Sequence, residues 1–230
     1  LSKVTVTGDK TLEVGKDGTV QPSLAVGALI GDFKVVVDQG ATFTLSAAQA
    51  TGKTIDGAAS TDIAQGGSIA ITGLGSVAVD FSKISAGAKV GTEIAGSVTA
   101  TTGAPTVTLT ADTKLGTAAI VVADTHTLTL SASQANDRAI TDAGDSGGLV
   151  VPGLAADTDL SKVVFNGSAT TVTATVDSSI DITANTTLGE VDLFKVLEGT
   201  TLTLSSAQAA ALDGISNNIF GVTGTPAVVG

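Results

Sequence analysis

The sequence predicts an all-β fold, a parallel β-solenoid with short helical corners, and tandem immunoglobulin-like β-sandwich repeats are the alternative. Three observations favour the solenoid. One strand-to-helix corner occurs three times, short strand patterns recur at roughly 10-residue spacing, and no Pro-rich or low-complexity linker separates the repeats. Sandwich domains in tandem are usually joined by exposed linkers, whereas the turns of a solenoid stack directly on one another.

The repeated corner reads TFTLSAAQ at residues 42–49, TLTLSASQ at 127–134 and TLTLSSAQ at 201–208. Each copy alternates polar and apolar residues like a half-buried strand and then continues with a serine and small helix-forming residues. A repeat of this kind has to be recognised before the rest of the fold is argued.

A short helix is expected in each corner. Ser46 is the expected N-cap of the first, which begins at Ala47. The second is expected to be cut short by Asn136-Asp137. The third is expected over residues 206–213, stopped by Gly214.

A second marker sets the period of the repeat. LSKV at residues 1–4 recurs as FSKI at 81–84 and as LSKV at 160–163, at nearly equal intervals. We therefore divide the sequence into repeats at 1–80, 81–159 and 160–230, expected to form one continuous elongated unit. The three corners are spaced less evenly than this marker, which indicates that connecting loops absorb insertions.

The remaining strands follow from polar–apolar alternation between Gly-rich turns. The sequence predicts strands at residues 4–7, 11–14, 34–38, 42–46, 54–55, 68–72 and 76–80 in repeat one, at 97–101, 106–110 and 118–122 in repeat two, and at 163–165, 170–176 and 180–183 in repeat three.

Composition excludes several classes of function. With 11 basic and 22 acidic residues the net charge is −11, which argues against nucleic acid and anionic membranes as partners, since both require a basic surface. The absence of Cys excludes disulfides, thiolate zinc sites and cysteine nucleophiles. No run approaches the roughly 20 apolar residues of a membrane span. We expect an extracellular protein that does not insert into membranes.

The residues that could perform catalysis are few. His126 is the single histidine and aligns with Ala41 and Thr200 in the turn before the corner strand, which predicts a solvated turn. Without a suitable histidine or cysteine, Ser-His and Cys-His nucleophiles are excluded. In the LSKV-like marker, the apolar residues are expected in the core and the lysine in water. The chain is therefore expected not to be an enzyme.

Four aspartates form the candidate metal site. Asp142, Asp145, Asp157 and Asp159 lie in or beside Gly-rich turns of repeat two, where carboxylate and carbonyl oxygens could bind calcium. Ordinary Asp-Gly turn chemistry explains the same residues. The glycine-rich calcium nonapeptide and the EF-hand loop are both absent from the sequence.

Gln49, Gln134 and Gln208 are the polar positions that all three corners share. Ligand contact on one face is one interpretation. The favoured interpretation is structural, because an amide at such a corner can donate to and accept from neighbouring backbone groups that would otherwise lack partners.

Thr-x-Thr pairs are frequent, and ranked threonines on a flat solenoid face can bind ice. Because the pairs lie far apart in the sequence, we do not expect them to form one continuous plane, and Thr is in any case a good residue for an outward strand face. The pairs are Thr5/Thr7, Thr42/Thr44, Thr106/Thr108, Thr127/Thr129, Thr171/Thr173 and Thr201/Thr203.

The corner motif, the ITG and VTG turns at residues 71–73 and 222–224, and the D-[FL]-S-K segments resemble repeats of bacterial surface proteins, namely S-layer-like proteins and type I-secreted giant adhesins. The resemblance implies an exported protein that assembles into lattices, sheaths or fibres, often with calcium. We expect a structural segment that self-associates through β-rich ends and has copies of itself as partners. An adhesin segment that binds surface glycan or host protein is the first alternative, and a β-helix polysaccharide-active enzyme is the second.

Overall fold

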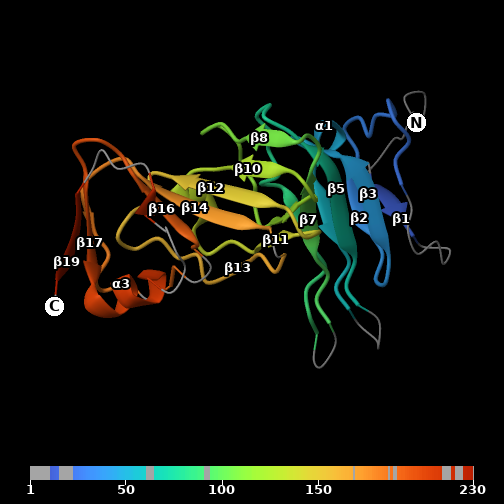
Figure 1. Ribbon diagram of the computed structural model, residues 1–230. Helices are drawn as coiled ribbons and strands as arrows, with labels where there is room; N and C mark the ends of the chain where they lie inside the picture. The colour runs from blue at the N-terminus through green and yellow to red at the C-terminus, as the bar shows by residue number, and fades with distance from the viewer. Residues whose placement is uncertain are drawn as a thin grey trace. The chain divides into compact units, whose positions relative to one another are not determined.

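The computed structural model is a parallel β-solenoid of about eight turns with three short helices (Figure 1). It describes residues 11–15, 23–60, 65–90, 94–167, 169–185, 187–188, 191–213, 219–220 and 225–229. The predictions made for residues 1–7, for Gly214 and for residues 222–224 lie outside the described residues.

Contacts divide the chain into two compact units. Unit 1 comprises Leu1–Ala104 and Asp112–Ile120, and unit 2 comprises Pro105–Ala111 and Val121–Gly230. This division differs from the three sequence repeats, which describe similarity along the chain and not compactness.

Unit 1 contains two groups of stacked strands and one helix. Its first sheet has the order β1-β2-β4-β6, and in its second β3 pairs with β5 and β5 with β7. The elements are β1 (Thr11–Val14), β2 (Lys34–Val37), β3 (Thr42–Ser46), α1 (Ala47–Ala50), β4 (Ile55–Gly57), β5 (Ser68–Leu74), β6 (Ile84–Ser85) and β7 (Val98–Thr102).

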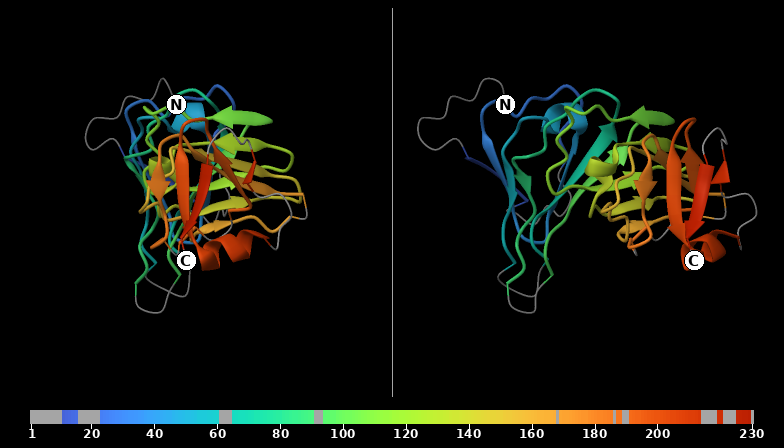
Figure 2. Two further views of the ribbon diagram at one scale, coloured as in Figure 1. Left: turned by 60° about the vertical axis from the view of Figure 1, so that its left-hand side comes forward. Right: turned by 90° about the vertical axis from the view of Figure 1, so that its left-hand side faces the viewer.

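Unit 2 repeats this architecture. One sheet has the order β18-β16-β14-β12-β10-β8, a second β15-β17-β19, and β11 pairs with β13. In both views of Figure 2, β17 and β19 run side by side next to α3. The elements are β8 (Thr106–Thr108), β10 (Thr127–Thr129), α2 (Ala132–Ala135), β11 (Ile140–Asp142), β12 (Gly148–Pro152), β13 (Val163–Val164), β14 (Thr171–Val176), β15 (Ile180–Asp181), β16 (Leu193–Val196), β17 (Thr201–Ser205), α3 (Ser206–Asp213), β18 (Ile219–Phe220) and β19 (Thr225–Val229). The remaining strand, β9 (Ala119–Val122), has residues in both units.

Parallel pairing decides between the two predicted folds. Each strand pair described above is parallel, and its partners lie one turn apart in the sequence. Ile55, for example, pairs with Val35 of the turn before it and with Ile84 of the turn after it. A sandwich would be built mainly from antiparallel strands. The solenoid prediction is confirmed, and the tandem-sandwich alternative is wrong.

The core follows from the alternation that predicts the strands. Every second side chain of a strand points inward, so each turn contributes two or three apolar residues to a stack inside the unit. Fully or almost fully buried members include Val35, Val37, Phe43, Leu45, Ile69 and Ile71 in unit 1, and Leu128, Leu130, Leu149, Val151, Val172 and Ala174 in unit 2.

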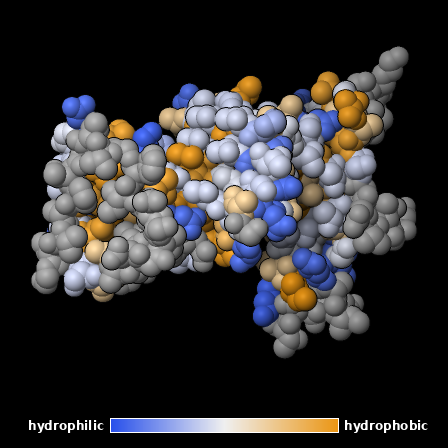
Figure 3. All heavy atoms as spheres, in the orientation of Figure 1, coloured by the Kyte–Doolittle hydropathy of each residue, from blue (hydrophilic) through white to orange (hydrophobic). Residues whose placement is uncertain are grey.

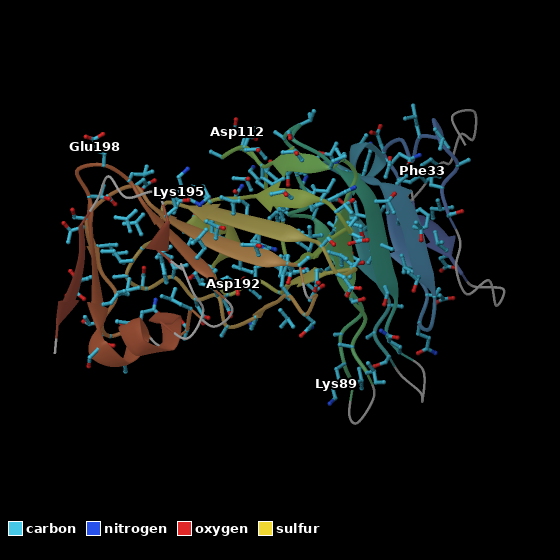
Figure 4. All side chains as sticks on the ribbon, viewed as in Figure 1. Phe33, Lys89, Asp112, Asp192, Lys195 and Glu198 are labelled. Atoms are coloured by element: carbon cyan, nitrogen blue, oxygen red, sulfur yellow. The ribbon has the colours of Figure 1, made fainter. Side chains whose placement is uncertain are left out.

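Two long turns of unit 1 form a glycine-rich projection. The described residues 57–60, 65–67, 86–90 and 94–97 belong to it, and Lys89 marks it in Figure 4. A chain of backbone hydrogen bonds crosses its base, from the N–H of Gly96 to the carbonyl of Gly87 (2.8 Å) and from the N–H of Gly87 to the carbonyl of Gly67 (2.9 Å). This insertion explains why the first two corners are further apart in the sequence than the second and third, while the framework keeps its register.

The predicted strand at residues 76–80 is wrong. Only Asp80 pairs there, in an isolated bridge with Lys114, and Val77 is 80% exposed. The segment instead changes direction, and at its end the carbonyl of Asp80 accepts a hydrogen bond from the N–H of Gly52. The sequence does not predict the strands β6, β11, β12, β16, β18 and β19.

The turn before each corner strand has the same geometry in all three copies. The N–H of Ala41, His126 and Thr200 donates to the carbonyl three residues earlier, at 3.1, 3.0 and 3.1 Å. The solvated turn predicted for these residues is wrong, because Ala41 and Thr200 are buried and His126 is half-buried. They face the interior because they begin the inward alternation of the strand that follows.

The residue before each of these positions has a positive φ, namely Gly40 at 75°, Thr125 at 62° and Gly199 at 77°. A β-branched residue in this left-handed region is strained by about 1–2 kcal/mol.

We expect Thr125→Gly to raise the free energy of unfolding by about 0.5–1 kcal/mol, because the relief of strain exceeds the extra chain entropy of glycine in the unfolded state. Denaturant unfolding measures the change. The matched reverse exchange is Gly199→Thr, where a Cβ would meet nothing within 4 Å. It should destabilise by about 1–2 kcal/mol. A loss of stability in Thr125→Gly would contradict the strain argument.

Candidate functional site: corners, acidic turns and threonine ranks

The three corners are closed by the same pair of side chains. The Oγ of Ser46 accepts from the N–H of Gln49 (3.3 Å), and the Oε1 of Gln49 accepts from the N–H of Ser46 (2.9 Å). Ser131 and Gln134 repeat this capping box. Ser205 and Gln208 make the same two bonds, at 3.2 and 2.8 Å. A capping box satisfies two backbone donors that a helix start leaves without partners.

The same amides also join each corner to the preceding turn of the solenoid. The Nε2 of Gln49 donates to the carbonyls of Ala25 and Ala28, at 2.9 and 3.0 Å. The Nε2 of Gln134 donates to the carbonyl of Thr110, at 2.9 Å. Nε2 of Gln208 donates to two carbonyls, those of Ile182 and Asn185, both at 2.7 Å. Each amide thus accepts and donates in the way the sequence predicts.

The following turn is joined to the first two corners by the backbone of an aspartate residue. At the first corner, the N–H of Asp80 donates to Oγ1 of Thr51 (2.8 Å). At the second, the N–H of Asp159 donates to Oδ1 of Asn136 (2.7 Å), and the N–H of Asp137 donates to the carbonyl of Asp159 (2.8 Å). A corner is therefore fastened on both sides, by its glutamine to the turn before and by an aspartate segment to the turn after.

Sequence reasoning missed this aspartate contact, although a signal was present. Asp80 and Asp159 open the two D-[FL]-S-K segments that set the period. In both segments the apolar residues on either side of Ser-Lys are buried, and the Ser-Lys residues themselves are exposed, as expected. The role of the aspartate depends on which turn stacks on the corner, and spacing alone does not give that.

Hydrogen bonds lower the pKa of several carboxyl groups. The hydroxyl and N–H of Ser82 lower the pKa of Asp80, those of Ser161 lower the pKa of Asp159, and the N–H and hydroxyl of Thr183 lower the pKa of Asp181. The pKa of Asp56 is lowered by its bond to Lys34 (2.8 Å between Nζ and Oδ2) and by Ser85. Each of the four carboxylates, in its ionised form, accepts hydrogen bonds from neighbouring groups.

These four groups should make the protein sensitive to acid. Their folded-state pKa values lie below the unfolded values, so the unfolded chain binds protons more readily once the pH falls below about 4. Their stabilisation is fully present above that pH and is lost as the pH falls through the folded-state pKa values. We expect the melting temperature to be flat from neutral pH down to about 5 and to fall below about 4. A melting temperature that rises on acidification would contradict these pKa directions.

The four aspartates of the candidate calcium site occupy two different turns. Asp142 accepts from the N–H of Asn166 through Oδ1 (3.2 Å), and the carbonyl of Asp145 accepts from Ala169. Asp157 is exposed, and Oδ1 of Asp159 accepts from the N–H of Ser161. In the described part of the chain, no three His, Asp or Glu side chains gather in a group that could hold a metal ion.

A hollow of about 350 Å³ lies beside α2 in unit 2. Asp157 is its one ionisable lining residue, and the hydroxyls of Ser131 and Ser133 lie 2.9 Å apart in its wall. The remaining lining residues are Ala132, Asn136, Gly153, Ala155 and Thr158.

Three Thr-x-Thr pairs of unit 2, on β8, β10 and β14, share one sheet face, which the sequence did not predict. The described pairs as a whole do not form one continuous plane, because Thr42/Thr44 lies on β3 and Thr201/Thr203 on β17, in other sheets. Stacking brings the pairs of consecutive turns into register, so that Thr106 lies opposite Thr127 and Thr108 opposite Thr129. The pair on β14 follows two strands further along the same sheet. In a solenoid, residues on neighbouring strands are one whole turn apart in the sequence. Distance along the sequence is therefore a poor guide to distance on the sheet.

Comparison with known proteins gives no relative: no family model matches the chain, and the searches of curated proteins and of solved structures found no match. Among the helices of the described residues, none is long and apolar enough to cross a membrane.

Proposed function

We propose that the chain is a structural, non-enzymatic segment of a bacterial extracellular assembly, such as an S-layer, sheath or filament. Its partners are copies of itself, with which it associates through strand edges at the ends of its sheets. The proposal extends the resemblance of the corner and D-[FL]-S-K motifs to repetitive surface proteins.

The observation that carries the proposal is the use of polar groups at the corners. Gln49 and Gln134 tie each corner to the turn before it, and Asp80 and Asp159 tie it to the turn after it. The carboxylate of Asp56 also joins turns, because it binds Lys34 of the turn before and Ser85 of the turn after. Polar groups that make hydrogen bonds between turns of the same chain favour a mechanical role.

The sheet edges supply surfaces for association. Within the described residues, β1 pairs only with β2, and β19 pairs only with β17. The outer edge of a parallel strand presents backbone donors and acceptors that can pair with another chain. Pro226 removes one donor from β19, so the β1 edge is the better one to test.

Sedimentation velocity over a range of concentrations tests the proposal. We expect species larger than the monomer that grow with concentration. An edge lysine opposes pairing, so Thr11→Lys, on the exposed first residue of β1, should reduce assembly about tenfold. Thr117→Lys adds the same charge at an exposed turn position and should leave assembly unchanged. A monomer at every concentration, with calcium and with chelator, would refute self-association.

The hollow beside α2 favours a second candidate function, an adhesin segment that binds surface glycan. Its serine hydroxyls and the carboxylate of Asp157 are groups that hydrogen-bond sugar hydroxyls. A glycan array tests this candidate: binding that Asp157→Ala abolishes would support it, and binding that survives Asp157→Ala would place the glycan elsewhere.

A further inference from the structure

The outward side chains of four neighbouring strands in unit 2 form a regular lattice. Thr127 lies between Thr106 and Gly148, and Thr129 lies between Thr108 and Val150 in the ladders. Neighbouring strands are about 4.8 Å apart, and alternate residues along one strand about 6.6 Å apart. We call this surface the threonine face; its members are Thr106, Thr108, Thr127, Thr129, Gly148, Val150, Pro152, Thr171, Thr173 and Thr175.

Buried side chains and the backbone ladder of the sheet hold the threonine face rigid. The residues between its members point inward, and Val107, Leu128 and Leu149 are fully buried. The backbone ladder fixes the strand spacing, and the branched threonine side chain has little rotational freedom about χ1. A surface fixed in this way loses little conformational entropy when it binds a partner.

The threonine face also carries no charge, although the chain has a net charge of −11. Ionisable residues lie at its border: Asp192 and Lys195 lie just before β16 and on β16 (Figure 4), and Asp177 follows the end of β14, beside Gly153. The hydroxyls of Thr127, Thr129 and Thr173 make no hydrogen bond to another described residue, so they are open to an external partner. In Figure 3 the middle of the molecule shows many pale spheres of intermediate hydropathy, with hydrophilic and hydrophobic ones among them.

A partner for such a face must be uncharged, rich in hydrogen-bonding groups and periodic in two directions. We propose that the threonine face binds ice. Threonine methyl and hydroxyl groups are ranked on β8, β10 and β14, while β12 between the last two contributes Gly148, Val150 and Pro152 and no hydroxyl. Water molecules held along these ranks repeat at multiples of the strand spacing, and waters ordered in this way bridge the protein to the crystal lattice. The proposal does not depend on the assembly role, because the face belongs to a single chain.

Two other kinds of partner fit the face less well. Protein interfaces depend on a few aromatic or arginine anchors that fill pockets, and the threonine face has neither. Stacking on the sugar rings of a crystalline polysaccharide uses aromatic side chains, and the chain contains no Trp or Tyr. Regularity and neutrality together favour ice.

The test is ice binding by the purified full chain, measured as thermal hysteresis of a seeded ice crystal and as inhibition of ice recrystallisation. We expect both activities in the unmodified protein. Thr129→Tyr places a large ring in the middle of the lattice and should lower thermal hysteresis about tenfold, because the ring displaces the ordered waters on either side of it.

Thr141→Tyr is the matched control. Thr141 is also a half-buried, outward threonine on a strand of unit 2, but it lies on β11 in another sheet. The thermal hysteresis of the Thr141→Tyr variant should stay within about twofold of that of the unmodified protein. Thr173→Lys is a second lattice variant in case Thr129→Tyr lowers the melting temperature, and it should also lose activity.

Three results would overturn the proposal. The first is an unmodified protein with neither thermal hysteresis nor inhibition of recrystallisation. The second is equal activity in Thr129→Tyr, Thr173→Lys and Thr141→Tyr. The third is binding to crystalline chitin or cellulose without any effect on ice, which would assign the face to polysaccharide.

Discussion

Gly87→Ala should lower the free energy of unfolding by about 3 kcal/mol or more, the upper range for overpacking a tightly packed site. A Cβ at this position would overlap the carbonyl oxygen of Ala58 and come within 2.6 Å of the backbone nitrogen of Gly67. Both neighbours are backbone atoms of stacked turns, so they cannot rotate away as a side chain would. The measurement is denaturant unfolding, with hydrogen exchange of the Gly87 and Gly96 amides as a local readout.

Gly75→Ala is the control for this substitution. Gly75 lies in the same unit, and a Cβ there would meet nothing within 4 Å. Its stability should change by no more than about 0.5 kcal/mol. If Gly87→Ala unfolds like the unmodified protein and its amides exchange no faster, the backbones of the projection are not packed as closely as described.

Gln134→Leu should destabilise the protein by about 1–3 kcal/mol, because a polar group that loses its partner away from water costs about that much. Leucine has a similar size but removes the two hydrogen bonds that the amide makes with the N–H of Ser131 and with the carbonyl of Thr110, at 3.0 and 2.9 Å. Thermal and denaturant unfolding both measure the change.

Gln65→Leu provides the comparison. Gln65 is exposed, and its side-chain amide donates a bond of 3.3 Å to the carbonyl of Ala95. The loss of this hydrogen bond should lower the free energy of unfolding by less than about 0.5 kcal/mol. Equal melting temperatures for Gln134→Leu and the unmodified protein would show that the corner amides do not fasten the turns together.

The corners were predictable because their chemistry is local. A serine followed three residues later by glutamine at the start of a helix defines a capping box from sequence alone. The alternation before it defines the strand, so β3 begins and ends, and α1 begins, where the sequence places them. Because the glutamine occurs in all three corners, the sequence also predicts that its amide forms hydrogen bonds with neighbouring backbone groups.

Contacts between turns were not predictable in the same way. Turns differ in length, as the pairing of Ile55 with Val35 on one side and Ile84 on the other shows, so sequence spacing does not say which residues stack. The contact of Asp80 with Thr51 depends on that register, as does the alignment of the threonine pairs. The sequence marks Gly66-Gly67 only as a turn, whereas the atoms around these glycines show that close backbone stacking requires them.

Negative-stain imaging of the purified chain, with calcium and with chelator, tests the proposed role most directly. We expect fibres, sheets or lattices whose formation the Thr11→Lys variant impairs and the Thr117→Lys variant does not. Separate particles of uniform size for the unmodified chain under every condition would contradict a self-associating structural role and would leave the solenoid fold without the function proposed for it.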